Sequence, residues 1–269
     1  MPEKIFDPGF AEAPDAVEAY ADFVAIVRQL RRDCPWDREQ THDSVKHLLI
    51  EEAYETIEAI DLRDWDELGK ELGDLLLHVV FHAVIASEAG HFDMKEVIER
   101  ETKKLVTRHP HVFGQTQVGG VTDVLNNWEQ IKMKEKGRTS ALDGVPAALP
   151  GLLRAHRIQE KAAGVGFDFP DAADAWEKVE EEMEEFGSLA VETAEAELLE
   201  DELGDVLFAV VNYARIRGLN AENALRRTNE KFSRRFQHIE RRLREQDRGL
   251  HEADLAEMDR YWDEAKANE

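Results

Sequence analysis

Four acidic residues stand at helical spacing on two consecutive predicted helices. Glu52 and Glu55 are three residues apart on the first, and Glu71 and Asp74 are three apart on the second. Residues at this spacing share one face of an α-helix. The second helix continues into the very apolar run 75–86. The four carboxylates are therefore expected beside the core, where they would converge between the two helices.

Carboxylates gathered in this way need a compensating charge. Burying an unpaired charge costs on the order of several kcal/mol, which is why protein cores rarely contain one. A divalent cation is one solution. Mg²⁺ is a hard ion that takes oxygen ligands and keeps positions open for water and phosphate groups, and Mn²⁺ can substitute for it. The alternatives are a solvated acidic face or pairs with Lys and Arg. A single acidic pattern would favour those alternatives, but this one occurs twice.

The second half of the chain repeats the acidic pattern. The motif Glu-Glu-x-x-Glu returns 130 residues later, and Glu-Leu-Gly-Asp returns 131 residues later. Such constant offsets indicate a duplicated domain. The repeated residues of the second half are Glu181, Glu182, Glu185, Glu202 and Asp205.

Cationic and aromatic residues repeat along with the acids. A Lys and an Arg four residues apart on one helix face are suited to holding phosphate oxygens, and a Trp ring offers a surface on which a base can stack. Taken singly, such residues are more often a solvated face and a core side chain. Their repetition with the acids favours nucleotide binding by Lys104, Arg108 and Trp128 in the first half and by Lys231, Arg235 and Trp262 in the second.

Composition and charge narrow the classes of partner. The 269 residues carry a formal net charge of −24, which repels nucleic acid polymers and anionic membrane surfaces. Small phosphorylated ligands remain compatible if metal ions bridge them. The one cysteine, Cys34, excludes an internal disulfide framework, and the first ten residues resemble no secretory signal. These features favour a cytoplasmic protein that binds neither nucleic acid nor membrane.

Helical periodicity runs through nearly the whole chain, and no alternating strand of any length stands out, so the predicted fold class is all-α. The Gly- and Pro-rich residues 137–151 read as a linker between a first domain at 1–136 and a second at 152–269. The predicted helices span 15–32, 43–62, 66–87, 93–109, 128–136, 152–163, 172–190, 194–217, 221–246 and 252–267.

These motifs together resemble one known family. An EExxE motif, a spacer and an ExxD motif lie in a helical chain with CPWD upstream and RHPHVF and NEKF downstream. This combination resembles the MazG nucleoside triphosphate pyrophosphohydrolases in their long, two-copy form. The resemblance implies tandem helical bundles that form a homodimer and hydrolyse nucleoside triphosphates to monophosphates and pyrophosphate with Mg²⁺. It also implies metal ligation by Glu182, Glu185, Glu202 and Asp205, with Lys231, Arg235 and Trp262 contacting nucleotide.

The two copies are not identical. Lys178 lies four residues before Glu182, on the ligand face, whereas the corresponding residue of the first copy is Leu48. The family can carry a lysine four residues before the ExxD glutamate, and this chain has Leu198 there. We expect the second copy to be the stronger catalyst, with Lys178 on the substrate and Glu181 or a ligand accepting a proton from water.

Two other classes of protein are alternatives to this interpretation. A di-metal carboxylate bundle needs Glu-x-x-His on two core helices; the matches at Glu39-x-x-His42 and Glu88-x-x-His91 lie at helix margins and are not repeated. A non-catalytic interaction module would use the acidic faces to pair with a basic partner. The Walker A pattern of P-loop ATPases is absent from the sequence.

Assembly is predicted from two apolar segments. Residues 75–86 and 206–216 are apolar on nearly every side, and such helices must be enclosed by neighbours. Either the two copies pack against each other within one chain, or each packs against the same copy of a second chain. The family resemblance favours the second arrangement, and a two-fold interface is the commonest way to close it. We expect a charge at Val80 or Val210 to weaken the dimer.

Overall fold

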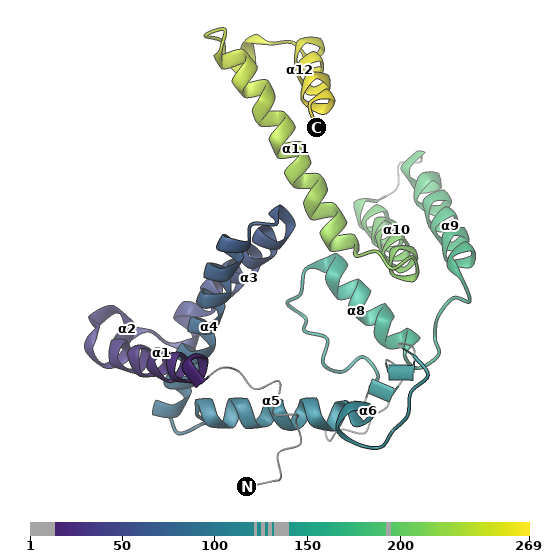
Figure 1. Ribbon diagram of the computed structural model, residues 1–269. Helices are drawn as coiled ribbons and strands as arrows, with labels where there is room; N and C mark the ends of the chain where they lie inside the picture. The colour runs from purple at the N-terminus through teal and green to yellow at the C-terminus, as the bar shows by residue number, and fades with distance from the viewer. Residues whose placement is uncertain (1–13, 121–122, 125–126, 129–130, 132–139, 192–194) are drawn as a thin grey trace. The chain divides into compact units, whose positions relative to one another are not determined.

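The computed structural model describes residues 14–120, 123–124, 127–128, 131, 140–191 and 195–269. In these residues the structure is helical and contains no β-strand, which confirms the predicted all-α class. The chain divides into two compact units, Met1–Trp128 and Glu129–Glu269 (Figure 1). The predicted linker at 137–151 is only partly described, so the domain limits drawn from the sequence stay a prediction.

The first unit is built around the antiparallel pair α3 and α4. Thr41 caps the start of α3, where its side chain and that of Ser44 each accept a hydrogen bond from the other residue's backbone. Arg63 then adopts a left-handed conformation that ends α3, and the Asp64 side chain caps α4. The helices are α1 (Pro14–Asp33), α2 (Pro35–Glu39), α3 (His42–Leu62), α4 (Trp65–Glu88), α5 (Met94–Arg108) and α6 (Pro110–Phe113).

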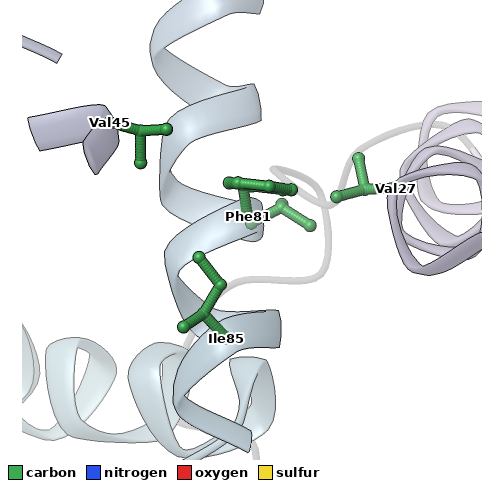
Figure 2. Packing of buried hydrophobic residues seen from close by; sticks show 5 residues of the cluster. Val27, Val45, Phe81 and Ile85 are labelled. Atoms are coloured by element: carbon green, nitrogen blue, oxygen red, sulfur yellow. The ribbon is translucent and has the colours of Figure 1, made fainter. Parts of the chain in front are cut away.

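The core of the first unit forms where α1 and α3 pack on α4. Figure 2 shows the Phe81 ring of α4 directed toward Val27 of α1, with Val45 of α3 and Ile85 of α4 close by. Val80 is completely buried in the same cluster. Burying each such apolar side chain contributes about 1.5–3 kcal/mol to the free energy of folding. This packing holds the three helices together and determines which face of α3 lies against α4.

The second unit follows a similar order. Helices α9 and α10 pack closely, α8 lies against α10, and α11 contacts α8 and α10 before continuing to α12 (Figure 1). Asn220 and Asp254 cap α11 and α12 through their side chains. The elements are α8 (Gly151–Ala163), α9 (Ala172–Val191), α10 (Ala196–Ile216), α11 (Ala221–Arg244), the 3₁₀ turn η2 (Leu250–Glu252) and α12 (Leu255–Ala267).

Two short helices escaped the sequence analysis. Both α2 and α6 begin with a proline, Pro35 and Pro110, and in the sequence each proline indicates only the end of the preceding helix. Proline is also favoured at the first position of a helix, where its missing N–H is not needed. Most of the helix predicted at 128–136 lies outside the described residues. Among the helices that are described, none combines the length and apolarity needed to cross a membrane.

Candidate metal centres

Three glutamates of the second unit converge between α9 and α10. Glu182 and Glu185 come from α9 and Glu202 from α10, and one carboxylate oxygen of each lies within 4.8 Å of the others. Glu182 is buried. The Oε2 atom of Glu202 is also buried and has no hydrogen-bond partner among the described residues. The tight packing of α9 on α10 therefore brings together carboxylates that are seventeen residues or more apart in the sequence.

The charge in this cluster is incompletely compensated. Burial raises the pKa of Glu202 above its usual value, and the neighbouring carboxylates of Glu185, Asp205 and Glu182 raise it further. A buried oxygen without a donor and a raised pKa both indicate missing positive charge. Carboxylate oxygens are the ligands that hard divalent cations prefer, so the donor set fits such an ion.

Lys178 supplies part of the compensation. Its Nζ lies 2.7 Å from a carboxylate oxygen of Glu182 and 2.7 Å from one of Glu181. Its hydrogen bonds to Glu181 and Glu182 raise the pKa of the ammonium group, which stays charged. One lysine cannot neutralise three glutamates and the adjacent Asp205, so a net negative charge remains beside the ammonium group.

A cavity of about 600 Å³ opens beside this cluster. Lys178, Glu182 and Asp205 contribute to its wall, and most of the remaining lining is apolar. Asp168, also in the lining, forms an ion pair with Arg215 that ties the loop after α8 to α10. The other lining residues include Leu142, Ile158, Phe167, Phe169, Phe208 and Asn212. An apolar cavity with a few convergent charged groups is the usual form of a small-ligand site.

The first unit contains a second cluster of the same composition. Glu52 and Glu55 of α3 and Glu71 of α4 each place a carboxylate oxygen within 4.8 Å of the others. Glu71 is buried, and its Oε2 has no hydrogen-bond partner among the described residues. Burial, followed by the charges of Asp74, Glu55 and Glu71, raises the pKa of Glu52 to about 7. These donors also fit a divalent cation.

Two predicted ligands are placed differently from the glutamates. In the described residues, the three-membered sets contain neither Asp74 nor Asp205. Asp74 still raises the pKa of Glu52, and Asp205 lines the cavity. The structure therefore brings six of the eight predicted metal ligands into two clusters and puts the two aspartates at their margins.

A glycine precedes each of these aspartates. A Cβ atom added at Gly73 or Gly204 would meet nothing within 4 Å, because both residues lie on open helix faces. Neither glycine is needed for packing between the helices described here.

The predicted nucleotide-binding residues of the second unit lie on α11 and α12. The Arg235 guanidinium lies 5.3 Å from the centre of the Trp262 ring and 2.6 Å from a carboxylate oxygen of Glu269. The ring centre of Phe232 lies 5.1 Å from that of Trp262. Among the described residues, neither these side chains nor Lys231 contribute to the cavity wall.

The corresponding residues of the first unit also contact neighbouring side chains. Lys104 forms an ion pair with Glu101 on α5, which also carries Arg108 near its end. The Trp128 ring lies 6.0 Å from that of His109. Their assignment to a nucleotide stays a prediction.

Comparison with known proteins identifies the family of this chain. The model of the MazG nucleotide pyrophosphohydrolase domain matches residues 40–113 and again residues 171–240. The chain belongs to the MazG family. Each of the two matched segments contains one of the glutamate clusters. The predicted resemblance is confirmed.

Similar proteins match nearly the whole of this chain. A Thermotoga maritima protein named nucleoside triphosphate pyrophosphohydrolase/pyrophosphatase MazG is 42% identical over 93% of this chain and 96% of its own length. An Escherichia coli K12 protein named nucleoside triphosphate pyrophosphohydrolase is 42% identical over 91% of this chain and 96% of its own. The uncharacterized protein YabN of Bacillus subtilis is 46% identical over 98% of this chain and 55% of its own length.

Three features of the structure were not predicted from the sequence. The cavity depends on the loop between α8 and α9, whose path no periodicity predicts. The ion pair between Asp168 and Arg215 spans 47 residues. A close contact between His42 and His82 spans 40 residues. The only available sequence signal for the last was the position of His82 on the face that α4 turns toward α3.

Proposed function

We propose that this protein is a Mg²⁺-dependent nucleoside triphosphate pyrophosphohydrolase that accepts several bases and uses its second copy as the main catalyst. The names of the relatives support the activity, and the two glutamate clusters support divalent-metal dependence. Mn²⁺ is expected to substitute, because it prefers the same oxygen ligands.

One observation carries the assignment of the second copy. The Oε2 atom of Glu202 has no hydrogen-bond partner among the described residues, and it belongs to a glutamate cluster whose Glu182 also lines the apolar cavity. The same cavity wall carries the ammonium group of Lys178. Metal ligands, a cation for phosphate and space for a base are thus adjacent in one unit.

The reaction is the attack of water on the phosphoanhydride. When bound, Mg²⁺ supplies positive charge that offsets the charge of the triphosphate and acidifies water. Glu182, Glu185 and Glu202 would hold the ion, with Asp205 beside them. Water forms a new bond to phosphorus, the bond between the α- and β-phosphates breaks, and the products are a nucleoside monophosphate and pyrophosphate. No covalent intermediate with the protein is involved.

Side chains of the second unit orient the reactants. Lys178 is positioned to bind a phosphate oxygen, because its ammonium group lies at the cavity wall. Glu181 accepts the proton of the attacking water. Since Glu181 pairs with Lys178 at 2.7 Å, the arrival of phosphate at Lys178 would free this carboxylate for the proton transfer.

The cationic residues of α11 contribute to substrate binding in this proposal. Lys231 and Arg235 hold phosphate oxygens, and Trp262 stacks on the base, with Lys104, Arg108 and Trp128 as counterparts in the first copy. Arg235 is paired with Glu269 in this structure, so substrate would replace Glu269 as its partner.

Product analysis tests the activity directly. The purified protein is incubated with Mg²⁺ and each of the common nucleoside triphosphates in turn, and monophosphate, diphosphate, pyrophosphate and phosphate are separated. Monophosphate with pyrophosphate is expected from several bases. Diphosphate with phosphate would contradict the proposed bond cleavage, and no turnover would favour the acidic interaction module instead.

A homodimer is the proposed assembly. Several large apolar side chains of α4 and α10 are exposed in the single chain, including Val79 at 43% and Val210 at 39%. Val80, chosen from the sequence, is completely buried in the first core, so a charge there would unfold the unit. Val79→Lys and Val210→Lys are the better probes. Light scattering of the wild type should give twice the 30.7 kDa chain mass, and an active monomer at micromolar concentration would contradict the proposal.

A further inference from the structure

The cavity of the second unit has two carboxamide side chains in its wall. Gln159 comes from α8 and Asn212 from α10, and the same wall contains Lys178 and Glu182. In the proposed function, that lysine and glutamate serve the phosphates and the metal ion, and the two amides have no role. An amide carries its hydrogen-bond acceptor and its donor group at opposite ends. The contacts of each amide within the protein therefore decide which end it can offer to a ligand.

A backbone carbonyl determines the orientation of the Gln159 amide. Its Nε2 donates a hydrogen bond of 2.8 Å to the carbonyl oxygen of Phe208, and a carbonyl oxygen can only accept. The Oε1 atom at the other end is buried and has no hydrogen-bond partner among the described residues. The residue is only 5% exposed. A buried acceptor without a donor costs about 1–3 kcal/mol, and a ligand in the cavity that supplies the donor would remove this cost.

The Asn212 amide is held by its oxygen instead. Its Oδ1 accepts hydrogen bonds from the Nε and Nη2 atoms of Arg215, at 3.1 and 2.7 Å. A guanidinium group can only donate, so the end of the amide that faces it must be the oxygen. The ion pair of Arg215 with Asp168 holds the guanidinium in place. The donor group Nδ2 therefore lies at the other end of the amide, away from Arg215.

The two amides lie close together on the side of the cavity that continues from the metal ligands. Phe208, which accepts the hydrogen bond from Gln159, precedes Asn212 by one turn of α10, or about 6 Å along the helix axis. Asp205 precedes Asn212 by seven residues, or roughly 10 Å along the same helix. A nucleotide whose phosphates lie at Lys178 can span that distance with its sugar and base. The apolar remainder of the wall suits the faces of a base.

We propose that these two amides bind the Watson–Crick edge of the substrate's base, with Gln159 accepting a hydrogen bond from the base and Asn212 donating one to it. These contacts presuppose the proposed function, since they are made to the base of its nucleotide substrate. Each common base carries a donor beside an acceptor on that edge, so one acceptor and one donor in the wall suit several bases. An amide contacts the edge of a base and an aromatic ring contacts its face, so these contacts are compatible with stacking on Trp262.

The first unit has neither amide at the corresponding positions. The offset of 131 residues that relates the two Glu-Leu-Gly-Asp motifs places Arg28 and Phe81 there. Arg28 is exposed, and Phe81 is part of the buried core of the first unit. A phenyl ring offers no hydrogen-bond donor, so the pair of amides belongs to the second copy alone. This agrees with the second copy as the main catalyst.

Substrate analogues that lack one group of the base edge test the two contacts separately. Purine riboside triphosphate is ATP without its amino group, and 1-deaza-ATP is ATP without the adjacent ring nitrogen. The wild type should use each analogue about tenfold less well than ATP in kcat/KM, because one polar group of the wall is then left unpaired. Gln159→Met should lose the preference for ATP over purine riboside triphosphate. Asn212→Asp, which keeps an oxygen toward Arg215, should lose the preference for ATP over 1-deaza-ATP.

Gln29→Met is the matched control, because it makes the same change at an exposed glutamine of the first unit, and it should keep both preferences. Two results would overturn the proposal. One is a wild type that uses ATP and the two analogues equally well. The other is an unchanged ratio of ATP to analogue in folded Gln159→Met or Asn212→Asp, even where both activities fall, since a purely structural role would give that result. The wild-type comparison needs no substitution, so it decides the matter where a variant does not fold.

Binding measurements separate this proposal from the proposed function. A wild type that hydrolyses no nucleotide would contradict the proposed function, and the dissociation constants of ATP and the two analogues, measured by calorimetry in Mg²⁺, would then replace kcat/KM in the same comparisons. A preference for ATP in binding that Gln159→Met removes would support the base contact without the activity. Equal binding of the three nucleotides, or binding of none, would overturn it.

Discussion

The two units contain the same three-glutamate cluster in different electrostatic surroundings. In the second, Lys178 lies 2.7 Å from Glu182, and a cavity adjoins the cluster. In the first, Leu48 takes the place of that lysine, and Glu52 has its pKa raised to about 7. Burial raises the pKa of a glutamate in both clusters, so the units differ in the lysine and the cavity beside the same ligands.

This difference shows that a cation outside the ligand set can assign separate roles to duplicated sites. A cluster with its own lysine has a cation beside its carboxylates and presents a donor to phosphate. A cluster without one depends on the bound ion for its charge balance. Exchanging or removing the features in which the two units differ tests this interpretation.

The largest effect is expected from removing one ligand of the second unit. Glu185→Gln should lower kcat/KM by about 100-fold or more, since loss of a ligand exceeds the 10–100-fold typical of outer partners. Glu185 is exposed, so the variant should fold. Glu55→Gln makes the same change in the first unit and should lose less than about threefold, if turnover is concentrated in the second. Steady-state kinetics at saturating Mg²⁺ measure both, and equal losses would abolish the distinction between the units.

A smaller effect is expected at the aspartates. Asp205→Asn should lower activity by about tenfold, because Asp205 lies at the margin of its cluster and in the cavity wall. Asp74→Asn should have less effect on the same assay. A greater loss in Asp74→Asn than in Asp205→Asn would assign the main activity to the first unit.

Exchanging the lysine and the leucine tests the cause of the difference. Lys178→Leu removes the 2.7 Å ion pair and should reduce kcat/KM by about tenfold, or about 1.4 kcal/mol in transition-state binding. The acidic limb of the pH profile should move to higher pH, because the cation that favours the ionised carboxylates is gone. Leu48→Lys should make the first unit more like the second.

Lys95→Leu is the control for this exchange, since it also removes an exposed lysine paired to a glutamate. Its pH profile should match that of the wild type. An unshifted profile in Lys178→Leu would mean that the lysine does not tune the cluster.

The smallest effect concerns protonation of the first unit. The pKa of Glu52 is raised from about 4.5 to about 7, so the metal-free folded protein binds more protons than the unfolded chain between these pH values. This contribution to stability is present below pH 4.5 and is lost as the pH rises through 7. In EDTA, the thermal midpoint of the wild type should fall relative to that of Glu52→Gln across this window and run parallel above it. Glu58→Gln, at an exposed position of the same helix, should keep the wild-type slope.

The sequence predicts the helices well because their ends are encoded locally. Thr41, Asp64 and Asp93 each cap a helix within a few residues of the predicted start, and the apolar period identifies the buried faces of α3 and α4. The short helices α2 and α6 were missed because proline both ends one helix and begins the next.

The candidate site is less completely encoded. The spacing of Glu182 and Glu185 identifies one helix face, and the repeat identifies its partner, so the clusters themselves are predictable. Which carboxylates converge depends on the rotation of α9 against α10, and that rotation leaves Asp205 at the margin. The contact between His42 and His82 requires the register of α3 against α4, which no local pattern gives.

Gly73 and Gly204 have a consequence for the energetics of the helices that contain them. A glycine within a helix is less favourable than alanine by about 0.5–1 kcal/mol, because it loses more backbone freedom on folding. In the described structure a Cβ atom at either position would meet nothing within 4 Å. Helices α4 and α10 are therefore each less stable than they would be with alanine at that position. The single chain thus has two uncrowded positions where a small substitution should raise its melting temperature, and where a second chain or a bound triphosphate could approach the backbone without meeting a side chain.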